Sequence, residues 1–236
     1  FFFFSTIKAN FPNKQSLLFQ PIFRISTGGK LSKEIPFMTD HEKFFFDLNG
    51  YLVIENALTP QEVAACNEAI DNNSDRQKVR PPEQSLSGES KALKGKHGRT
   101  DLGGMLTWPK PWCQPFLDII ALPSAIQAML AVIGPRFRLA GTAGLSMTKG
   151  SEGFILHGGG TPELEHMREV FHHRFENGRM KNGLVSVSYT LSDVGSADGG
   201  FVCIPGSHKA NYLCPIEVRR LEVDLGCVEH VPMKAG

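Results

Sequence analysis

The feature that most constrains the fold is a pair of β-like blocks in the C-terminal part of the chain. Residues 184–191 read Leu-Val-Ser-Val-Ser-Tyr-Thr-Leu, and residues 199–209 read Gly-Gly-Phe-Val-Cys-Ile-Pro-Gly-Ser-His-Lys. From Phe137 onward, short β-like runs are separated by glycines, whereas helical patterns come before that residue. Helices followed by strands predict an α+β chain, mainly β with N-terminal helices, whose strands form a β-sandwich.

Composition and charge exclude several classes of protein. The chain has 236 residues, a formal net charge of +1 and an apolar share of 41%, which is enough for one packed domain. A nucleic-acid partner is not expected, because such proteins normally carry a strongly basic face. No run approaches the roughly 18 apolar residues that a membrane span needs, so no membrane span is expected. Five scattered cysteines without a Cys-x-x-Cys pair argue against a zinc knuckle and favour a reducing, intracellular compartment.

The N-terminal segment differs in composition from the rest of the chain. Residues 1–33 contain Lys and Arg but no acidic residue, together with many Phe and Ser, which is typical of an organelle transit peptide. The alternative is that Met38 is the true start and that the preceding residues are misassigned upstream sequence. In either case we expect residues 1–37 to lie outside the fold and one domain to cover residues 38–236, in the cytoplasm or an organelle.

Two helices are expected at the start of this domain. Thr39 with Glu42 three residues later forms a capping-box pattern, and Gly50 is a natural stop. Residues 51–54 then read as a short strand. A second capping box begins at Thr59 and predicts a helix to about residue 72.

A long polar stretch separates these helices from the next one. Residues 73–101 are expected to form a loop. Trp108 and Trp112 follow it and are expected to be packing anchors. The next helix should run from about residue 115 to residue 133, with a break at Pro123.

Taken in order, four blocks of the chain resemble the phytanoyl-CoA dioxygenase family: residues 44–54, 156–159, 184–191 and 199–209. The resemblance implies a double-stranded β-helix, a jelly roll of the cupin type. It also implies an oxidoreductase that uses Fe(II), 2-oxoglutarate and O2 to hydroxylate a small organic substrate. In the family, the strand with the last metal ligand and the arginine that binds 2-oxoglutarate would follow residue 236. We therefore expect the fold to be incomplete at its C-terminus and this chain to be an inactive fragment.

The resemblance also points to one metal ligand. Centres of this kind hold iron with two histidines and one carboxylate. His157 stands where the family has its first histidine, so it is predicted to be a metal ligand and a catalytic residue. The family's carboxylate position is Gly159 here, which leaves three alternatives. The protein could be a divergent dioxygenase that uses Glu163 or Glu165, a halogenase with chloride in the vacant position, or a non-catalytic cupin-like binding module.

Other polar residues receive weaker roles. Ser186 and Ser188 share one face of the expected strand and are predicted to bind the co-substrate. His208 is expected to be a structural turn residue, and Asp193 a remote alternative carboxylate. The histidine-containing segment 163–177 is expected to be a solvated loop or short exposed helix. The sequence leaves the substrate and the oligomeric state open.

Overall fold

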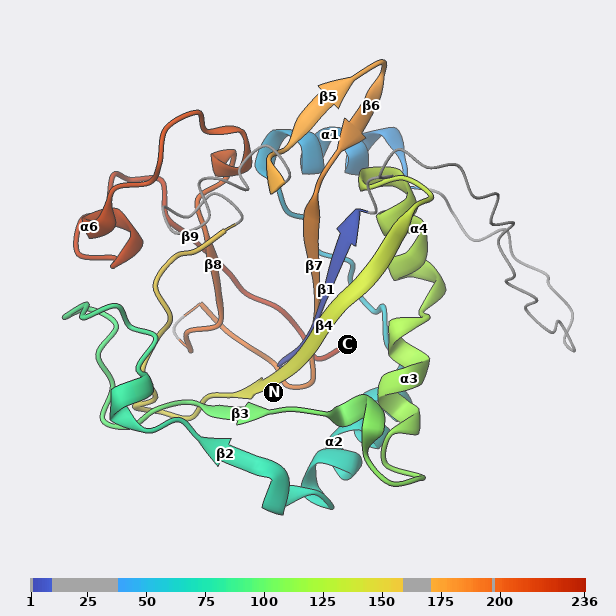
Figure 1. Cartoon of the computed structure of the whole chain (residues 1–236), viewed down its shortest axis with the longest axis vertical. Helices are drawn as coiled ribbons and strands as arrows, with labels where there is room; N and C mark the ends of the chain where they lie inside the picture. The colour runs from blue at the N-terminus through green and yellow to red at the C-terminus, as the bar shows by residue number, and fades with distance from the viewer. Residues whose placement is uncertain (1, 10–37, 159–170, 197) are drawn as a thin grey trace, which may run out of the picture.

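The computed structural model describes residues 2–9, 38–158, 171–196 and 198–236, and Figure 1 shows their arrangement. Most helices come before most strands in the chain, as the sequence patterns predict. The helices are α1 (Asp40–Asn49), α2 (Pro60–Asp71), α3 (Gln114–Ile120), α4 (Pro123–Val132) and α6 (Ile216–Arg219). The strands are β1 (Phe2–Ala9), β2 (Gln77–Val79), β3 (Thr100–Leu102), β4 (Phe137–Ser146), β5 (Arg174–Glu176), β6 (Arg179–Lys181), β7 (Leu184–Thr190), β8 (Phe201–Cys203) and β9 (Glu229–Val231).

The largest sheet contains five strands in the order β2-β3-β4-β1-β7, and each neighbouring pair is antiparallel. Two further antiparallel pairs are β5-β6 and β8-β9. In Figure 1, α3 and α4 lie to one side of β4, whereas β8, β9 and α6 lie to the other side. Helices combined with antiparallel sheets agree with the expected class, while the complete double-stranded β-helix stays a prediction.

The N-terminal strand β1 differs from the expectation that residues 1–37 lie outside the fold. It pairs with β4 on one side and with β7 on the other, in a register that places Phe4 opposite Ala143 and Ser188. A run of aromatic and β-branched residues suits a strand with partners on both sides. The sequence interpretation weighed the basic composition of this segment and overlooked its β-propensity. Residues 10–37 lie outside the described part of the chain, and the assignment of the segment as a leader stays a prediction.

The first two helices begin at the predicted capping boxes. Thr39 Oγ1 accepts a hydrogen bond from the backbone N–H of Glu42, whose carboxylate accepts from the N–H of Thr39. Thr59 and Glu62 form the same reciprocal pair at the start of α2. Gly50 ends α1 in the left-handed conformation, with φ of 82°. These local predictions are confirmed.

The main core joins α2 and α3 to the sheet. Trp108 is buried against Phe116 with its ring edge-on, and its indole N–H donates to a backbone carbonyl. The hydroxyl of Tyr189 on β7 donates to the carbonyl oxygen of Ile119 over 2.8 Å. The expected helix is divided at Pro123, which starts α4. The packing role of Trp108 and the break are both confirmed.

One stretch of the described chain is long and apolar enough to cross a membrane by length and composition alone: Gln114–Val132. This differs from the expectation that no run approaches that length. The stretch includes both α3 and α4, and core residues from both helices are buried within the domain. Such a stretch is weak evidence for a membrane span, because core helices of other proteins have the same composition.

Three local predictions were wrong. Residues 51–54 are not part of a strand, and instead run beneath α1 toward the cavity described below. The polar stretch 73–101 is not a continuous loop, since it contains β2 and the start of β3. The third prediction, a solvated loop or short exposed helix over 163–177, fails only at the described end of the segment, where Arg174–Glu176 form β5; residues 163–170 lie outside the described residues. In each case pairing or its absence depends on distant chain segments, which local patterns do not encode.

Candidate functional site

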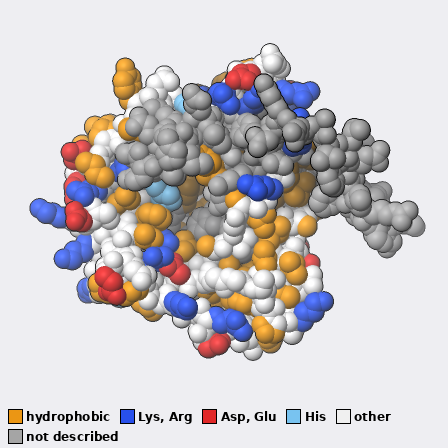
Figure 2. All heavy atoms as spheres, viewed as in Figure 1, with side chains coloured by type: hydrophobic (Ala, Val, Ile, Leu, Met, Phe, Trp, Pro, Cys, Tyr) orange, Lys and Arg blue, Asp and Glu red, His pale blue; other side chains and the backbone are white. Residues whose placement is uncertain are grey.

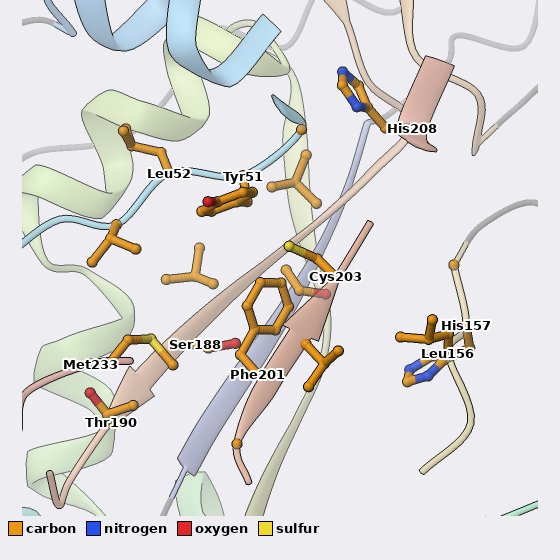
Figure 3. Close-up of a pocket in the computed structure, with 18 of the residues that line it drawn as sticks. Tyr51, Leu52, Leu156, His157, Ser188, Thr190, Phe201, Cys203, His208 and Met233 are labelled. Atoms are coloured by element: carbon orange, nitrogen blue, oxygen red, sulfur yellow. The ribbon is translucent and has the colours of Figure 1, made fainter. Parts of the chain in front are cut away.

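A large cavity of about 1800 Å³ opens beside β7. The segment after α1, the strands β7 and β8 and the segment around His157 all contribute to its wall, as Figure 3 shows. On the face drawn in Figure 2, hydrophobic side chains and a histidine border a recess. Its volume exceeds the 300–1,000 Å³ typical of small-molecule sites. The cavity therefore has room for an organic substrate together with a co-substrate.

His157 is exposed on this wall and is fixed in orientation by its own segment. Its Nδ1 lies 3.0 Å from the carbonyl oxygen of Ile155, which can only accept, so Nδ1 carries the hydrogen. The ring of Phe154 stacks on the imidazole, with centroids 4.0 Å apart and planes 22° apart. Nε2 has no hydrogen-bond partner among the described residues. Histidine ligands of metals characteristically donate their other ring nitrogen to a carbonyl or carboxylate in this way.

An arginine also packs on the ring of Phe154. The guanidinium carbon of Arg99 lies 5.2 Å from the centre of the Phe154 ring. Its Nε donates to Asp101 over 2.9 Å, and Asp101 also pairs with Arg80. Burial lowers the pKa of Arg99, and the charge of Asp101 acts against this shift. Arg99 thus shares the Asp101 carboxylate with Arg80, and it also contacts the aromatic ring that stacks on His157.

Ser186 and Ser188 are two exposed residues of β7, a strand whose residues all line the cavity. Both are exposed and line the cavity, and Ser188 is drawn beside β8 in Figure 3. Val187, between them, packs against the buried core. The predicted alternation of the strand therefore places the serine hydroxyls where they can contact a small molecule. Their role in binding a co-substrate stays a prediction.

The described residues supply one candidate metal ligand and not a complete set. No group of three or more His, Cys, Asp or Glu side chains suitable for a metal occurs among residues 2–9, 38–158, 171–196 and 198–236. Gly159, Glu163 and Glu165 fall outside these ranges, so the alternatives for the carboxylate stay open. The fixed tautomer of His157 fits a single iron ligand.

The turn that contains His208 follows β8 and is hydrogen-bonded to the C-terminal part of α1. The N–H of Gly206 donates to the carbonyl oxygen of Asn49 over 2.9 Å. His208, in a short 3-10 turn (Ser207–Lys209), places Nε2 3.1 Å from the carbonyl oxygen of Asp47. Figure 3 draws His208 on the far side of β8 from His157. These contacts support the predicted structural role of His208.

The sequence interpretation missed a buried polar cluster next to this turn. His173, expected in a solvated segment, is only 9% exposed. Its Nδ1 lies 2.8 Å from Asn182 Oδ1, and its Nε2 lies 3.3 Å from a carboxylate oxygen of Asp47. The rings of His173 and His208 meet edge-on with centroids 4.8 Å apart. No sequence spacing indicates this cluster, because its members come from α1, the segment before β5 and the segment before β7.

Asp193 makes structural contacts. One carboxylate oxygen accepts a hydrogen bond from Lys234 Nζ over 2.7 Å, and the other accepts from the N–H of Ala235. The bond from Lys234 is the main cause that lowers the pKa of Asp193. Asp193 thus ties the end of β7 to residues 234–235. Both of its carboxylate oxygens therefore already have a hydrogen-bond partner in the C-terminal segment.

The fold and the cavity together define a class of protein: a domain of mixed helices and antiparallel sheets with a large cavity beside β7. The family whose model matches residues 46–236 is described as "Phytanoyl-CoA dioxygenase (PhyH)", and the chain belongs to this family. The family groups Fe(II)- and 2-oxoglutarate-dependent oxygenases with a cupin-type β-fold. No curated protein and no solved structure matches the chain. The match confirms the resemblance that the motif order indicates.

Proposed function

We propose that this protein is an Fe(II)- and 2-oxoglutarate-dependent oxygenase that hydroxylates a small organic substrate in the cavity beside β7. The observation that carries the proposal is the position of His157. It lines the cavity in a family of such oxygenases, with Nδ1 engaged by a backbone carbonyl and Nε2 unpaired as far as the described part of the chain shows. Iron and 2-oxoglutarate, when bound, supply the oxidising chemistry through O2.

The protein's own groups orient and enclose the reactants. The carbonyl oxygen of Ile155 keeps the hydrogen of His157 on Nδ1, and Phe154 restricts rotation of the ring. Ser186 and Ser188 offer hydroxyl groups on the β7 part of the cavity wall, which suit the carboxylates of 2-oxoglutarate. Apolar side chains elsewhere in the cavity suit an organic substrate and keep water away from it.

Turnover of 2-oxoglutarate tests this proposal. The protein, expressed as its gene encodes it, should form succinate only with Fe(II) and O2 present. A chelator should stop the reaction, and added Fe(II) should restore it. His157→Ala should lower the rate by at least about 100-fold. His41→Ala changes an exposed histidine of α1 outside the cavity and should leave the rate unchanged. Equal rates for the two variants would remove His157 from the proposal.

A halogenase is the second candidate, and Gly159 favours it. A glycine provides no carboxylate at the position where the resemblance places one, and chloride would then occupy the vacant position. Gly159 lies outside the described residues, so the argument depends on sequence alone. Product analysis with and without chloride distinguishes the candidates: a chlorinated product supports the halogenase, and a hydroxylated product that is independent of chloride supports the oxygenase.

A further inference from the structure

A second buried charge in the cavity wall is not explained by the proposed iron chemistry. Arg219, at the end of α6, is 8% exposed and lines the cavity. Its Nε donates to the carbonyl oxygen of Leu156 over 3.0 Å, and the N–H of Leu156 donates back to the carbonyl oxygen of Arg219. The guanidinium is therefore anchored one residue away from His157.

No described residue neutralises this charge. Within the described ranges, no carboxylate lies within 4.0 Å of Arg219, whereas Arg80, Arg99 and Arg220 all have acidic partners. The only side-chain hydrogen bond of Arg219 to a described residue uses Nε, which leaves the donors of both Nη groups. Arginine stays protonated in proteins, and a buried charge without a counter-ion is costly.

The thiol of Cys214 does not supply a negative charge that would balance Arg219. Cys214 lines the cavity close enough to Arg219 to feel its charge. Burial nevertheless raises the pKa of Cys214, and the opposing effect of Arg219 is smaller. The thiol is therefore neutral at physiological pH and supplies no negative charge. By contrast, the buried carboxylate of Glu152 accepts hydrogen bonds from Ser85 and Leu86, so the fold satisfies its other buried charge.

We propose that Arg219 binds the carboxylate of the organic substrate and holds that substrate beside His157. The two Nη groups, which have no hydrogen-bond partner within the described ranges, match the two oxygens of a carboxylate in a bidentate pair. Arg219 belongs to α6 and is bonded to Leu156, whereas the serines predicted to bind the co-substrate belong to β7, so the two groups come from different elements of the cavity wall. The proposal rests on the proposed function only in treating the cavity as the substrate site.

Binding of a matched pair of probes tests this site without iron. Hexanoate and hexanamide have the same apolar chain and differ in charge, so calorimetric titration of each isolates the contribution of the carboxylate. The protein should bind hexanoate about 10- to 100-fold more tightly than hexanamide. Arg219→Gln should abolish this preference for hexanoate. Arg219→Lys should keep part of it, because lysine retains the charge but cannot donate two parallel hydrogen bonds to a carboxylate.

Arg220→Gln is the matched control. Arg220 is the next residue, but its guanidinium pairs with Glu89, so its loss should leave the preference unchanged. Thermal melting of each variant checks that it is folded, and Arg219→Lys serves if Arg219→Gln does not fold. Equal affinity of the unaltered protein for the two probes would overturn the proposal, as would a full preference in Arg219→Gln.

A further titration, with succinate, distinguishes a carboxylate of the substrate from a carboxylate of the co-substrate. If succinate, a four-carbon dicarboxylate related to 2-oxoglutarate, showed the same dependence on Arg219 and hexanoate showed none, the residue would bind the co-substrate and the substrate assignment would be wrong. Loss of the hexanoate preference in Arg219→Gln would support the site even if no 2-oxoglutarate turnover were found, so the two proposals fail separately.

Discussion

The imidazole of His208 lies directly against the backbone of Gly50: a Cβ added to Gly50 would come within 2.3 Å of His208 Nδ1. Gly50 ends α1, and His208 belongs to the turn after β8, so this contact is where the two segments meet. The turn motif of residues 205–209 thus serves to position β8 against α1.

Replacing Gly50 with Ala should destabilise the protein more than the backbone angle alone explains. Gly50 has a φ of 82° and Gly178 a φ of 73°, but only Gly50 has a neighbour in the way. Gly178→Ala should cost about 1–2 kcal/mol of unfolding free energy. Gly50→Ala should cost about 2–5 kcal/mol, since the clash adds to the strain. Urea unfolding measures both, and equal losses would show that the contact is unimportant.

Stability should fall on acidification, partly because of His208. Burial is the main cause that lowers the pKa of His208, and the nearby His173 and Lys209 add to it, while Asp47 acts in the opposite direction. Below the ordinary value of 6.5, the unfolded chain takes up a proton that the folded protein resists. The unfolding free energy should therefore decrease as the pH falls below about 6.5.

The corresponding measurement compares urea unfolding at pH 7.5 and pH 5.5. His208→Gln should show a smaller decrease than the unaltered protein. His230→Gln, which removes an exposed histidine of β9, should show the original decrease. If His208→Gln and the unaltered protein lost the same free energy, the pKa of His208 would not contribute.

Asn182 should be important for stability because its side chain links two segments of the chain through buried hydrogen bonds. Its Nδ2 donates to the carbonyl oxygen of Val132, and its Oδ1 accepts from His173, in a buried setting. Asn182→Ala leaves buried groups without partners and should cost about 1–3 kcal/mol. Asn72→Ala removes an exposed side-chain bond within one helix end and should cost less than about 0.5 kcal/mol. Denaturant unfolding of both variants gives the comparison.

The strand β1 should protect its two neighbours from hydrogen exchange. Because β1 pairs with both β4 and β7, deletion of residues 2–9 exposes two strand edges. Amides of β4 and β7 that face β1 should then exchange at least about tenfold faster. The hairpin β5-β6 pairs only with itself and serves as an internal reference. Unchanged exchange in β4 and β7 would show that β1 does not contribute to the sheet.

The features that sequence predicted are those set by neighbouring residues. Both capping boxes, the break at Pro123 and the strand β7 follow from short-range rules, and the structure has all of them. The motif order predicted the family, which the match over residues 46–236 confirms.

The features that sequence missed depend on contacts between distant segments. His173 is buried because Asp47 and Asn182 surround it, and Arg219 is buried because α6 packs against Leu156. Neither residue stands in a pattern that distinguishes it from an exposed one. The position of β1 between β4 and β7 is likewise a property of the sheet and not of the strand's own residues.

The central claim is that His157 binds the iron of a 2-oxoglutarate-dependent oxygenase, and an anaerobic titration tests it most directly. Fe(II) added with 2-oxoglutarate should produce the visible charge-transfer absorption of an iron–2-oxoglutarate chelate in the protein as its gene encodes it. His157→Ala should lose this absorption, and His41→Ala should keep it. Absorption of equal intensity in His157→Ala, or none in the unaltered protein, would contradict the claim.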